Sequence, residues 1–182
     1  CSGNTLLKGN TAVRIDFGGC LKYRARGGSK AYSFEVPELS SLLNPKINPE
    51  SANLFKNMTR EDLINSLKRV QSVTNKDIEQ VYLSTYQYIE PDIFVNISMR
   101  KSYLAFILKE AEKTQIKPNQ TLIEYVEQLS AKIKPDFDKY VQRKMIELSK
   151  VGYKDVIDDM LLQRSQMHNT YDADRKSTRL NS

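Results

Sequence analysis

The sequence predicts a mainly α-helical protein, in which a short N-terminal β-hairpin precedes about six or seven helices. After Pro45, apolar residues recur at helical spacing, and capping residues and prolines divide this pattern into segments. Before it, residues 11–15 are rich in β-branched and apolar side chains, and residues 20–25 alternate apolar with polar or basic ones. Both stretches are typical of strands or extended chain.

Helix boundaries follow from capping residues and prolines. Pro49 can begin a short helix that runs to residue 55, and the Thr59–Asp62 spacing is typical of a capping box at the start of the next helix. Thr74 or Asn75 can cap a third helix, which Pro91 is expected to end. Four further helices are expected at residues 98–113, 121–133, 135–150 and 153–166, with Gly152 at the C′ position between the last two.

The apolar stripes of these helices predict a packed core. They are interpreted as core because apolar and aromatic residues at helical spacing generally face the protein interior. The charged positions of the same helices, such as Glu110 and Glu112, are interpreted as solvated faces. The predicted core includes Leu63, Ile64, Leu67 and Val70, then Ile78, Val81, Tyr82, Thr85 and Tyr86, and later Phe106 and Tyr125.

Composition excludes several functional classes. With 182 residues, 40% hydrophobic content and a mean hydropathy of −0.54, the chain suits one globular domain with a modest core, or part of a larger one. No apolar stretch approaches the roughly 20 residues of a membrane helix, so no transmembrane segment is expected. Because His168 is the only histidine, zinc sites and Ser-His-Asp or Cys-His catalysis are disfavoured.

The cysteines indicate the cellular compartment, and the first residue indicates that the chain is part of a longer protein. Cys1 and Cys20 form neither a CxxC metal spacing nor a disulfide framework, which favours reduced thiols and a cytoplasmic protein, or one delivered to a host cytosol. The first residue is Cys1 rather than Met, so the chain is expected to begin inside a longer protein. The domain prediction assigns residues 1–173 to one unit, with a metal-binding and loop segment over 1–37 and helices over 45–168, and residues 174–182 to a disordered, non-native tail.

Positive charge is concentrated near the N-terminus. The formal net charge is +6, yet residues 31–173 carry nearly equal numbers of acidic and basic side chains. Residues 1–30 contain one acid, Asp16, and six basic side chains, those of Lys8, Arg14, Lys22, Arg24, Arg26 and Lys30. Tyr23 and Tyr32 interleave with the arginines, as aromatic residues do in single-strand binders. Nucleic-acid binding is nevertheless disfavoured, because the neutral remainder offers no second basic stripe.

Asn4 and Asp16 are the candidates for a metal site. Magnesium takes hard oxygen ligands, and one carboxylate with one amide oxygen is a suitable pair beside a triphosphate. A turn at Gly9 and Asn10 reverses the chain between residues 5–8 and 11–15, which would bring Asn4 and Asp16 together. Gly18 and Gly19 give the backbone freedom to approach phosphate.

These residues carry a resemblance to a known family. The order Asn-x-Leu-Leu from Asn4, a short turn, then Ile-Asp-Phe-Gly up to Gly18 resembles the catalytic-loop asparagine and the Asp-Phe-Gly metal motif of the protein-kinase-like superfamily. It is most similar to the phosphatidylinositol 3- and 4-kinase branch and related atypical bacterial kinases. The second glycine, Gly19, favours a divergent atypical kinase. The helical part would then correspond to a kinase C-lobe.

The resemblance implies a function and assigns roles. It makes Asp16 the catalytic metal ligand and Asn4 the second ligand of Mg²⁺, with ATP as the phosphate donor and Phe17 as a packing residue. Residues 21–30 would be the activation loop, in which Lys22, Arg24 and Arg26 bind an anionic substrate, a phosphoinositide or a protein. The catalytic aspartate, the glycine-rich loop and the phosphate-anchoring lysine would lie before Cys1, so the isolated chain is expected to be inactive.

Two other interpretations stay open at this point. Asp16, Phe17, Gly18 and Gly19 are also compatible with a β-turn in which the aspartate accepts turn N–H groups and the glycines supply positive φ. The chain would then be a non-catalytic helical interaction module. A degenerate pseudokinase is the other alternative.

Overall fold

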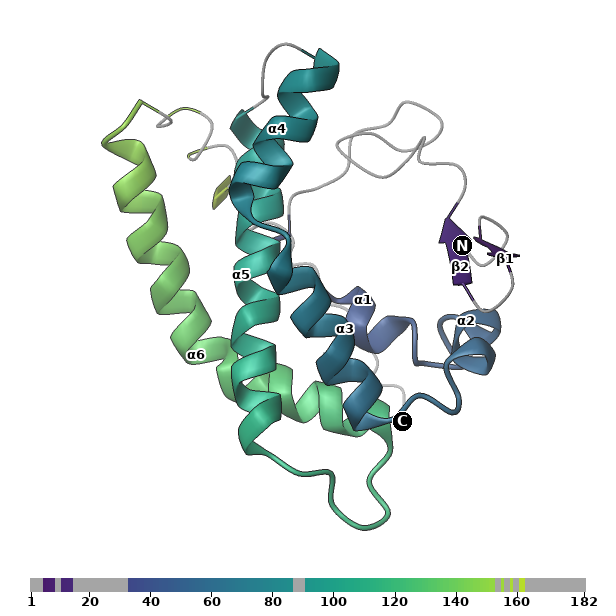
Figure 1. Ribbon diagram of the computed structural model, residues 1–182. Helices are drawn as coiled ribbons and strands as arrows, with labels where there is room; N and C mark the ends of the chain where they lie inside the picture. Colours follow the sequence, from purple (N-terminus) through teal and green to yellow (C-terminus); the bar gives the residue numbers. More distant parts are fainter. Residues whose placement is uncertain are drawn as a thin grey trace.

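The computed structural model describes residues 5–8, 11–14, 33–86 and 91–152, together with Asp155, Asp158, Leu161 and Leu162. No side chain before Ser33 is described, nor are those of Tyr82, Thr85 and Tyr86. In this part of the chain the protein is mainly α-helical, as predicted. The helices are α1 (Glu38–Ser41), α2 (Pro49–Leu54), α3 (Arg60–Ser72), α4 (Asn75–Tyr86), α5 (Pro91–Lys113) and α6 (Leu122–Ser149) (Figure 1).

Two short strands precede the helices. β1 (Thr5–Lys8) and β2 (Thr11–Arg14) are antiparallel, with Thr5 opposite Arg14 and Lys8 opposite Thr11. The side chains of both strands, and residues 1–4, 9–10 and 15–32 as a whole, lie outside the described residues. The N-terminal hairpin as an element that holds a metal ion therefore stays a prediction.

The core lies among α3, α5 and α6. Helix α5 packs against both α3 and α6, and it lies between them in Figure 1. Each of the three helices directs one apolar stripe inward, and burying these stripes removes apolar surface from water. The most deeply buried side chains include Leu63 and Leu67 of α3, Met99, Tyr103 and Ile107 of α5, and Tyr125, Leu129, Phe137 and Val141 of α6.

Helices α5 and α6 correct two predicted boundaries. Pro91 begins α5 instead of only ending the preceding helix, and α5 therefore starts seven residues before the predicted Ser98. Proline fits the first helical position because a backbone N–H at that position would make no hydrogen bond within the helix, so its absence costs nothing. The predicted break before Pro135 is also wrong, since α6 continues through that residue. Figure 1 shows α6 changing direction along its length, which a proline inside a helix explains.

The C-terminal end of α5 is closed by side chains from two other elements. The Arg60 guanidinium donates to the carbonyl oxygens of Thr114, at 3.0 Å, and Ala111, at 2.6 Å. The hydroxyl of Tyr125, which is completely buried, donates to the same Thr114 oxygen at 2.7 Å. These bonds satisfy carbonyls that a helix end leaves without partners, and the arginine charge is favourable beside the negative end of the helix dipole.

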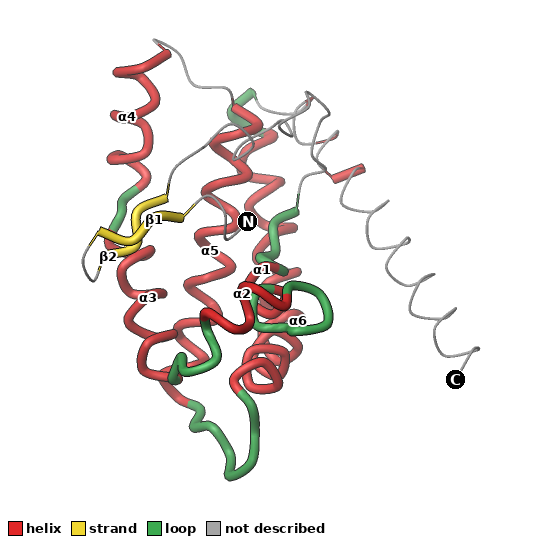
Figure 2. Tube along the Cα trace, turned by 90° about the vertical axis from the view of Figure 1, so that its right-hand side faces the viewer, coloured by secondary structure: helices red, strands yellow, loops and turns green. Residues whose placement is uncertain are grey.

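Helix α4 departs from the predicted core. Its start at Asn75 agrees with the prediction, but Val81 is 68% exposed and Leu83 is 48% exposed. Val81 is therefore not a core residue, although the helical spacing predicted one. Val70 of α3 is likewise 41% exposed, because it lies at the edge of the packed stripe rather than inside it. Figure 2 shows α4 extending beyond the end of α3, away from the main body.

Gly152 lies two residues after Lys150, the C-cap of α6, and has a φ of +94°. It adopts the left-handed conformation that the sequence predicted for a helix-terminating glycine, one position later than expected. The predicted helix over residues 153–166 falls mostly outside the described residues.

Three capping boxes fix helix starts, and each contains a carboxylate. Thr59 and Asp62 form the box at α3, Thr74 and Asp77 exchange the same bonds at α4, and Thr121 and Glu124 form the box at α6. Hydrogen bonds from the threonine hydroxyl and backbone N–H lower the pKa of Asp62 and Asp77 below the ordinary value of 3.8. The same kinds of bond, from Thr121, lower the pKa of Glu124 below 4.5.

We expect these boxes to make stability depend on pH in the acid range. The pKa of each carboxylate is lower in the folded than in the unfolded state. The stability that each ionised carboxylate adds to the fold is therefore complete above the ordinary values of 3.8 and 4.5, and it is lost as pH falls through the lower folded values. The variant Asp62→Asn/Asp77→Asn/Glu124→Gln should thus be less stable than wild type at pH 7, with a smaller difference at pH 3. Urea unfolding at both pH values measures this, and Asp136→Asn, at an exposed carboxylate of α6, is the control. An equal difference at both pH values would contradict it.

Candidate functional site

The residues predicted to carry the chemistry lie outside the described side chains. This holds for the metal ligands Asn4 and Asp16, of which Asp16 is also the catalytic residue, and for Gly18 and Gly19, which were expected to let the backbone approach phosphate. It also holds for the basic residues Lys22, Arg24 and Arg26. Their roles stay predictions. The structure does describe the segment that follows the basic loop, beginning at Ser33, and how this segment is attached to the helices.

Arg100 of α5 anchors this segment. Its guanidinium donates to the carbonyl oxygen of Glu35 at 2.9 Å and to Glu38 Oε2 at 2.7 Å, and more weakly to the carbonyl oxygen of Ser33 at 3.4 Å. One side chain on α5 thus holds both the segment that leads into α1 and the first residue of α1. A planar guanidinium with several donors suits this arrangement, whereas a lysine ammonium would not reach all the acceptors.

Asn96 and Phe34 complete the attachment. Asn96, one turn before Arg100 on α5, donates from Nδ2 to the carbonyl oxygen of Ser33 at 3.2 Å. Phe34 is 1% exposed and belongs to the hydrophobic core. Residues 33–38 are therefore fixed by a buried aromatic anchor on one side and by charge-assisted hydrogen bonds on the other. We call this arrangement the Arg100 clamp.

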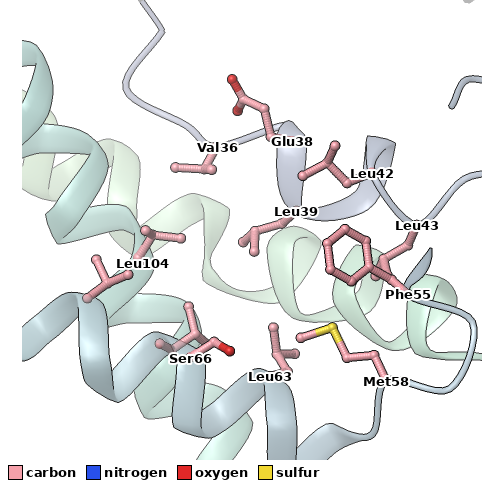
Figure 3. A pocket seen from close by; sticks show the side chains of 12 residues that line it. Val36, Glu38, Leu39, Leu42, Leu43, Phe55, Met58, Leu63, Ser66 and Leu104 are labelled. Atoms are coloured by element: carbon pink, nitrogen blue, oxygen red, sulfur yellow. The ribbon is translucent and has the colours of Figure 1, made fainter. Parts of the chain in front are cut away.

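An apolar pocket lies beside the Arg100 clamp, between α1 and α3. It has a volume of about 320 Å³. Figure 3 shows its side chains converging from α1, from α3, from the connection between α2 and α3, and from α5. The lining is apolar except for Glu38 and Ser66; it comprises Val36, Leu39, Leu42, Leu43, Phe55, Met58, Leu63, Leu67, Val70 and Leu104.

The two polar side chains at the pocket differ in their surroundings. The Glu38 carboxylate points away from the apolar side chains in Figure 3 and is paired with Arg100. Ser66 lies on the exposed side of α3, with its hydroxyl at the pocket. The pocket therefore offers an apolar interior, a neutralised carboxylate at one edge and a single hydroxyl at the mouth.

Among the described residues, no group of three or more His, Cys, Asp or Glu side chains is placed to hold a metal ion. This does not bear on Asn4 and Asp16, whose side chains are not described. In the same part of the chain, no helix has both the length and the apolar character needed to cross a membrane.

Neither the Arg100 clamp nor the pocket was predicted from the sequence. The sequence assigned Arg100 only to a helix and assigned Asn96 to no element, since a contact between residues more than 60 positions apart leaves no local pattern. The sequence Val36, Pro37, Glu38 was the one available indication for the clamp, because it places a carboxylate after a proline that can begin a turn of helix. The pocket depends on where α1 lies relative to α3, which hydrophobic periodicity does not specify.

Comparison with known proteins does not add an identification. No protein-family model, no curated protein and no solved structure matches the chain. The sequence motif and the contacts described above are thus the basis on which a function is proposed.

Proposed function

We propose that this chain is the C-terminal, helical portion of an ATP- and Mg²⁺-dependent kinase-like phosphotransferase. In this proposal Asp16 is the principal metal ligand, Asn4 is the second, and Gly18 and Gly19 allow the backbone to approach phosphate. A carboxylate and an amide oxygen are a donor set that fits Mg²⁺. If Asn4 and Asp16 hold Mg²⁺, the ion would supply electrostatic stabilisation of the charge that develops during phosphoryl transfer.

The Arg100 clamp is the observation that carries the proposal. In the proposal, the activation loop covers residues 21–30, after Asp16, Phe17 and Gly18, and the segment from Ser33 to Glu38 follows it along the chain. The pairing of Glu38 with Arg100 at 2.7 Å ties that following segment to the helical body. A loop that must hold a substrate in register needs such a fixed end.

The basic loop supplies the substrate specificity in this proposal. Lys22, Arg24 and Arg26 would bind an anionic acceptor, a phosphoinositide or an acidic protein segment, by charge-assisted hydrogen bonds. The acceptor hydroxyl attacks the γ-phosphorus of ATP, the bond to the bridging oxygen of ADP breaks, and the hydroxyl proton passes to a base.

A non-catalytic helical interaction module is the second candidate. The open apolar pocket favours it, because partner-binding surfaces expose apolar residues. The two candidates differ in what Arg100 does. In an interaction module the Arg100 clamp only stabilises the fold, whereas in a phosphotransferase it also positions a loop that acts in turnover.

The variant Arg100→Ala in the full-length protein separates the candidates. We expect phosphoryl transfer from Mg-ATP to fall by about tenfold, which corresponds to the 1.4 kcal/mol scale of one lost charge-assisted bond to a partly exposed group. Far-ultraviolet circular dichroism should stay unchanged, because Phe34 still anchors the segment. Arg100→Lys should restore little activity, since the ammonium cannot replace the bridging geometry.

Lys109→Ala, at an exposed position on the same helix, is the matched control and should retain full turnover. If Arg100→Ala and Lys109→Ala turned over Mg-ATP equally fast, the Arg100 clamp would have no part in catalysis, and the proposal would lose its structural support.

A further inference from the structure

We propose that the apolar pocket between α1 and α3 binds the hydrocarbon chain of a neutral amphiphile, such as a long-chain alcohol or an acyl ester. The inference uses no residue of the proposed metal site, although the Glu38–Arg100 pair also belongs to the Arg100 clamp. It follows from the size, the rigidity and the charge of the pocket.

The size of the pocket suits one chain rather than a folded partner. A volume of about 320 Å³ lies at the lower end of the range for small-molecule sites. It corresponds to roughly ten groups of water size, at about 30 Å³ each. Twelve residues line the pocket, whereas a stable protein interface uses about 20–30 residues on each side. A chain of about ten methylene groups therefore matches the space better than a protein surface does.

The pocket has a buried floor and an open rim. Leu63 and Leu67, which form the floor, are each 3% exposed and belong to the hydrophobic core. Leu42, Phe55 and Val70, which lie at the rim, are 37%, 40% and 41% exposed. Apolar rim residues that remain in contact with water lose that contact when a hydrocarbon chain enters, so binding is favoured by the hydrophobic effect.

The walls are fixed independently of any ligand. Helix α1 is held to α5 by the Glu38–Arg100 ion pair. The chain after α1 is held by the Asn48 side chain, whose Nδ2 donates to the carbonyl oxygen of Ser41 at 2.9 Å. The Met58 N–H donates to the Phe55 carbonyl oxygen at 2.9 Å, which fixes the turn that carries both lining side chains. A preformed site needs little ordering of protein when the ligand binds.

The charges around the pocket select a neutral head group. Glu38 is the one ionisable residue of the lining, and Arg100 already balances it. A carboxylate head group would meet the Glu38 charge without a cation of its own, while an ammonium head group would have to compete with Arg100. The Ser66 hydroxyl at the mouth can both donate to and accept from an alcohol or ester oxygen.

Isothermal titration of the 182-residue chain with 1-decanol tests the proposal. We expect saturable binding of one molecule per chain and weaker binding of decanoate at pH 8. Val70→Trp should fill the mouth of the pocket and weaken 1-decanol binding by at least tenfold. Val81→Trp, at an exposed position on α4 outside the lining, is the matched control and should bind like wild type.

Three outcomes would overturn the inference. The first is the absence of saturable 1-decanol binding, and the second is an equal loss of binding in both tryptophan variants. The third is a concentration-dependent dimer in sedimentation equilibrium that Val70→Trp abolishes, since a second copy would then be the occupant. Asp16→Ala should bind 1-decanol normally, so a failure of the phosphotransferase proposal and a failure of the pocket assignment give different results.

Discussion

Asp16→Ala in the full-length protein is expected to lower the rate of phosphoryl transfer from Mg-ATP by about a thousandfold or more. A bound metal ion supplies several kcal/mol of charge stabilisation in such a transition state, and each 1.36 kcal/mol is a factor of ten in rate. Asp16 is the only acid among the first 30 residues, so no neighbouring carboxylate in this segment can replace it. Initial rates at saturating ATP and Mg²⁺ measure the effect.

Two further variants separate loss of a metal ligand from general damage. Asn4→Ala removes the neutral ligand and should cause a smaller loss of activity than Asp16→Ala. A higher Mg²⁺ concentration should partly restore the activity of Asn4→Ala. Asp136→Ala changes an exposed aspartate on α6 and should leave the rate unchanged. Full activity of Asp16→Ala would contradict its assignment as the principal metal ligand.

Phe137→Ala is expected to destabilise the fold by about 3–5 kcal/mol, the range for removing a buried phenylalanine. The Phe137 ring is 1% exposed and makes edge-on contacts with the Tyr103 and Phe106 rings, at centroid distances of 5.0 and 5.7 Å. The variant loses both the burial and these ring contacts. Urea unfolding followed by circular dichroism gives the difference in free energy of unfolding.

Lys139→Ala, two residues further along α6 and exposed, is the control and should change stability by less than about 0.5 kcal/mol. A loss below about 1 kcal/mol for Phe137→Ala would mean that α6 does not pack on α5 at this point. The order of the core described above would then be incorrect.

Local interactions were the part of the fold that the sequence predicted best. The capping box at Thr59 and Asp62 was correctly predicted, and Thr74 does cap α4. Such boxes form between residues three positions apart, so their physics is contained in a short stretch of sequence. The buried stripe of Leu63, Ile64 and Leu67 followed from helical periodicity in the same way.

The predicted break at Pro135 failed because tertiary packing outweighed a local cost. A proline inside a helix costs about 3 kcal/mol. However, Leu129, Ile133, Phe137 and Val141 recur every four residues across Pro135, and all of them are buried against the same core. This unbroken spacing was the indication of one helix, and burial of these four side chains is worth more than the lost bond.

Contacts between distant segments could not be predicted from one sequence. Arg100 and Glu38 are 62 positions apart, and the pocket depends on where α1 lies relative to α3. Val81 illustrates the same limit, since it is an apolar residue at helical spacing and yet is exposed in the structure. Periodicity specifies which face of a helix is apolar, and only the packing of whole elements decides what covers that face.

A crystal structure of the full-length protein with Mg²⁺ and a non-hydrolysable ATP analogue is the most direct test of the proposed metal site. It should show one side-chain oxygen from Asn4 and one from Asp16 on the same ion, each about 2.0–2.1 Å away. An ion bound by other residues, or an Asp16 carboxylate turned to solvent while the nucleotide is bound, would contradict the assignment.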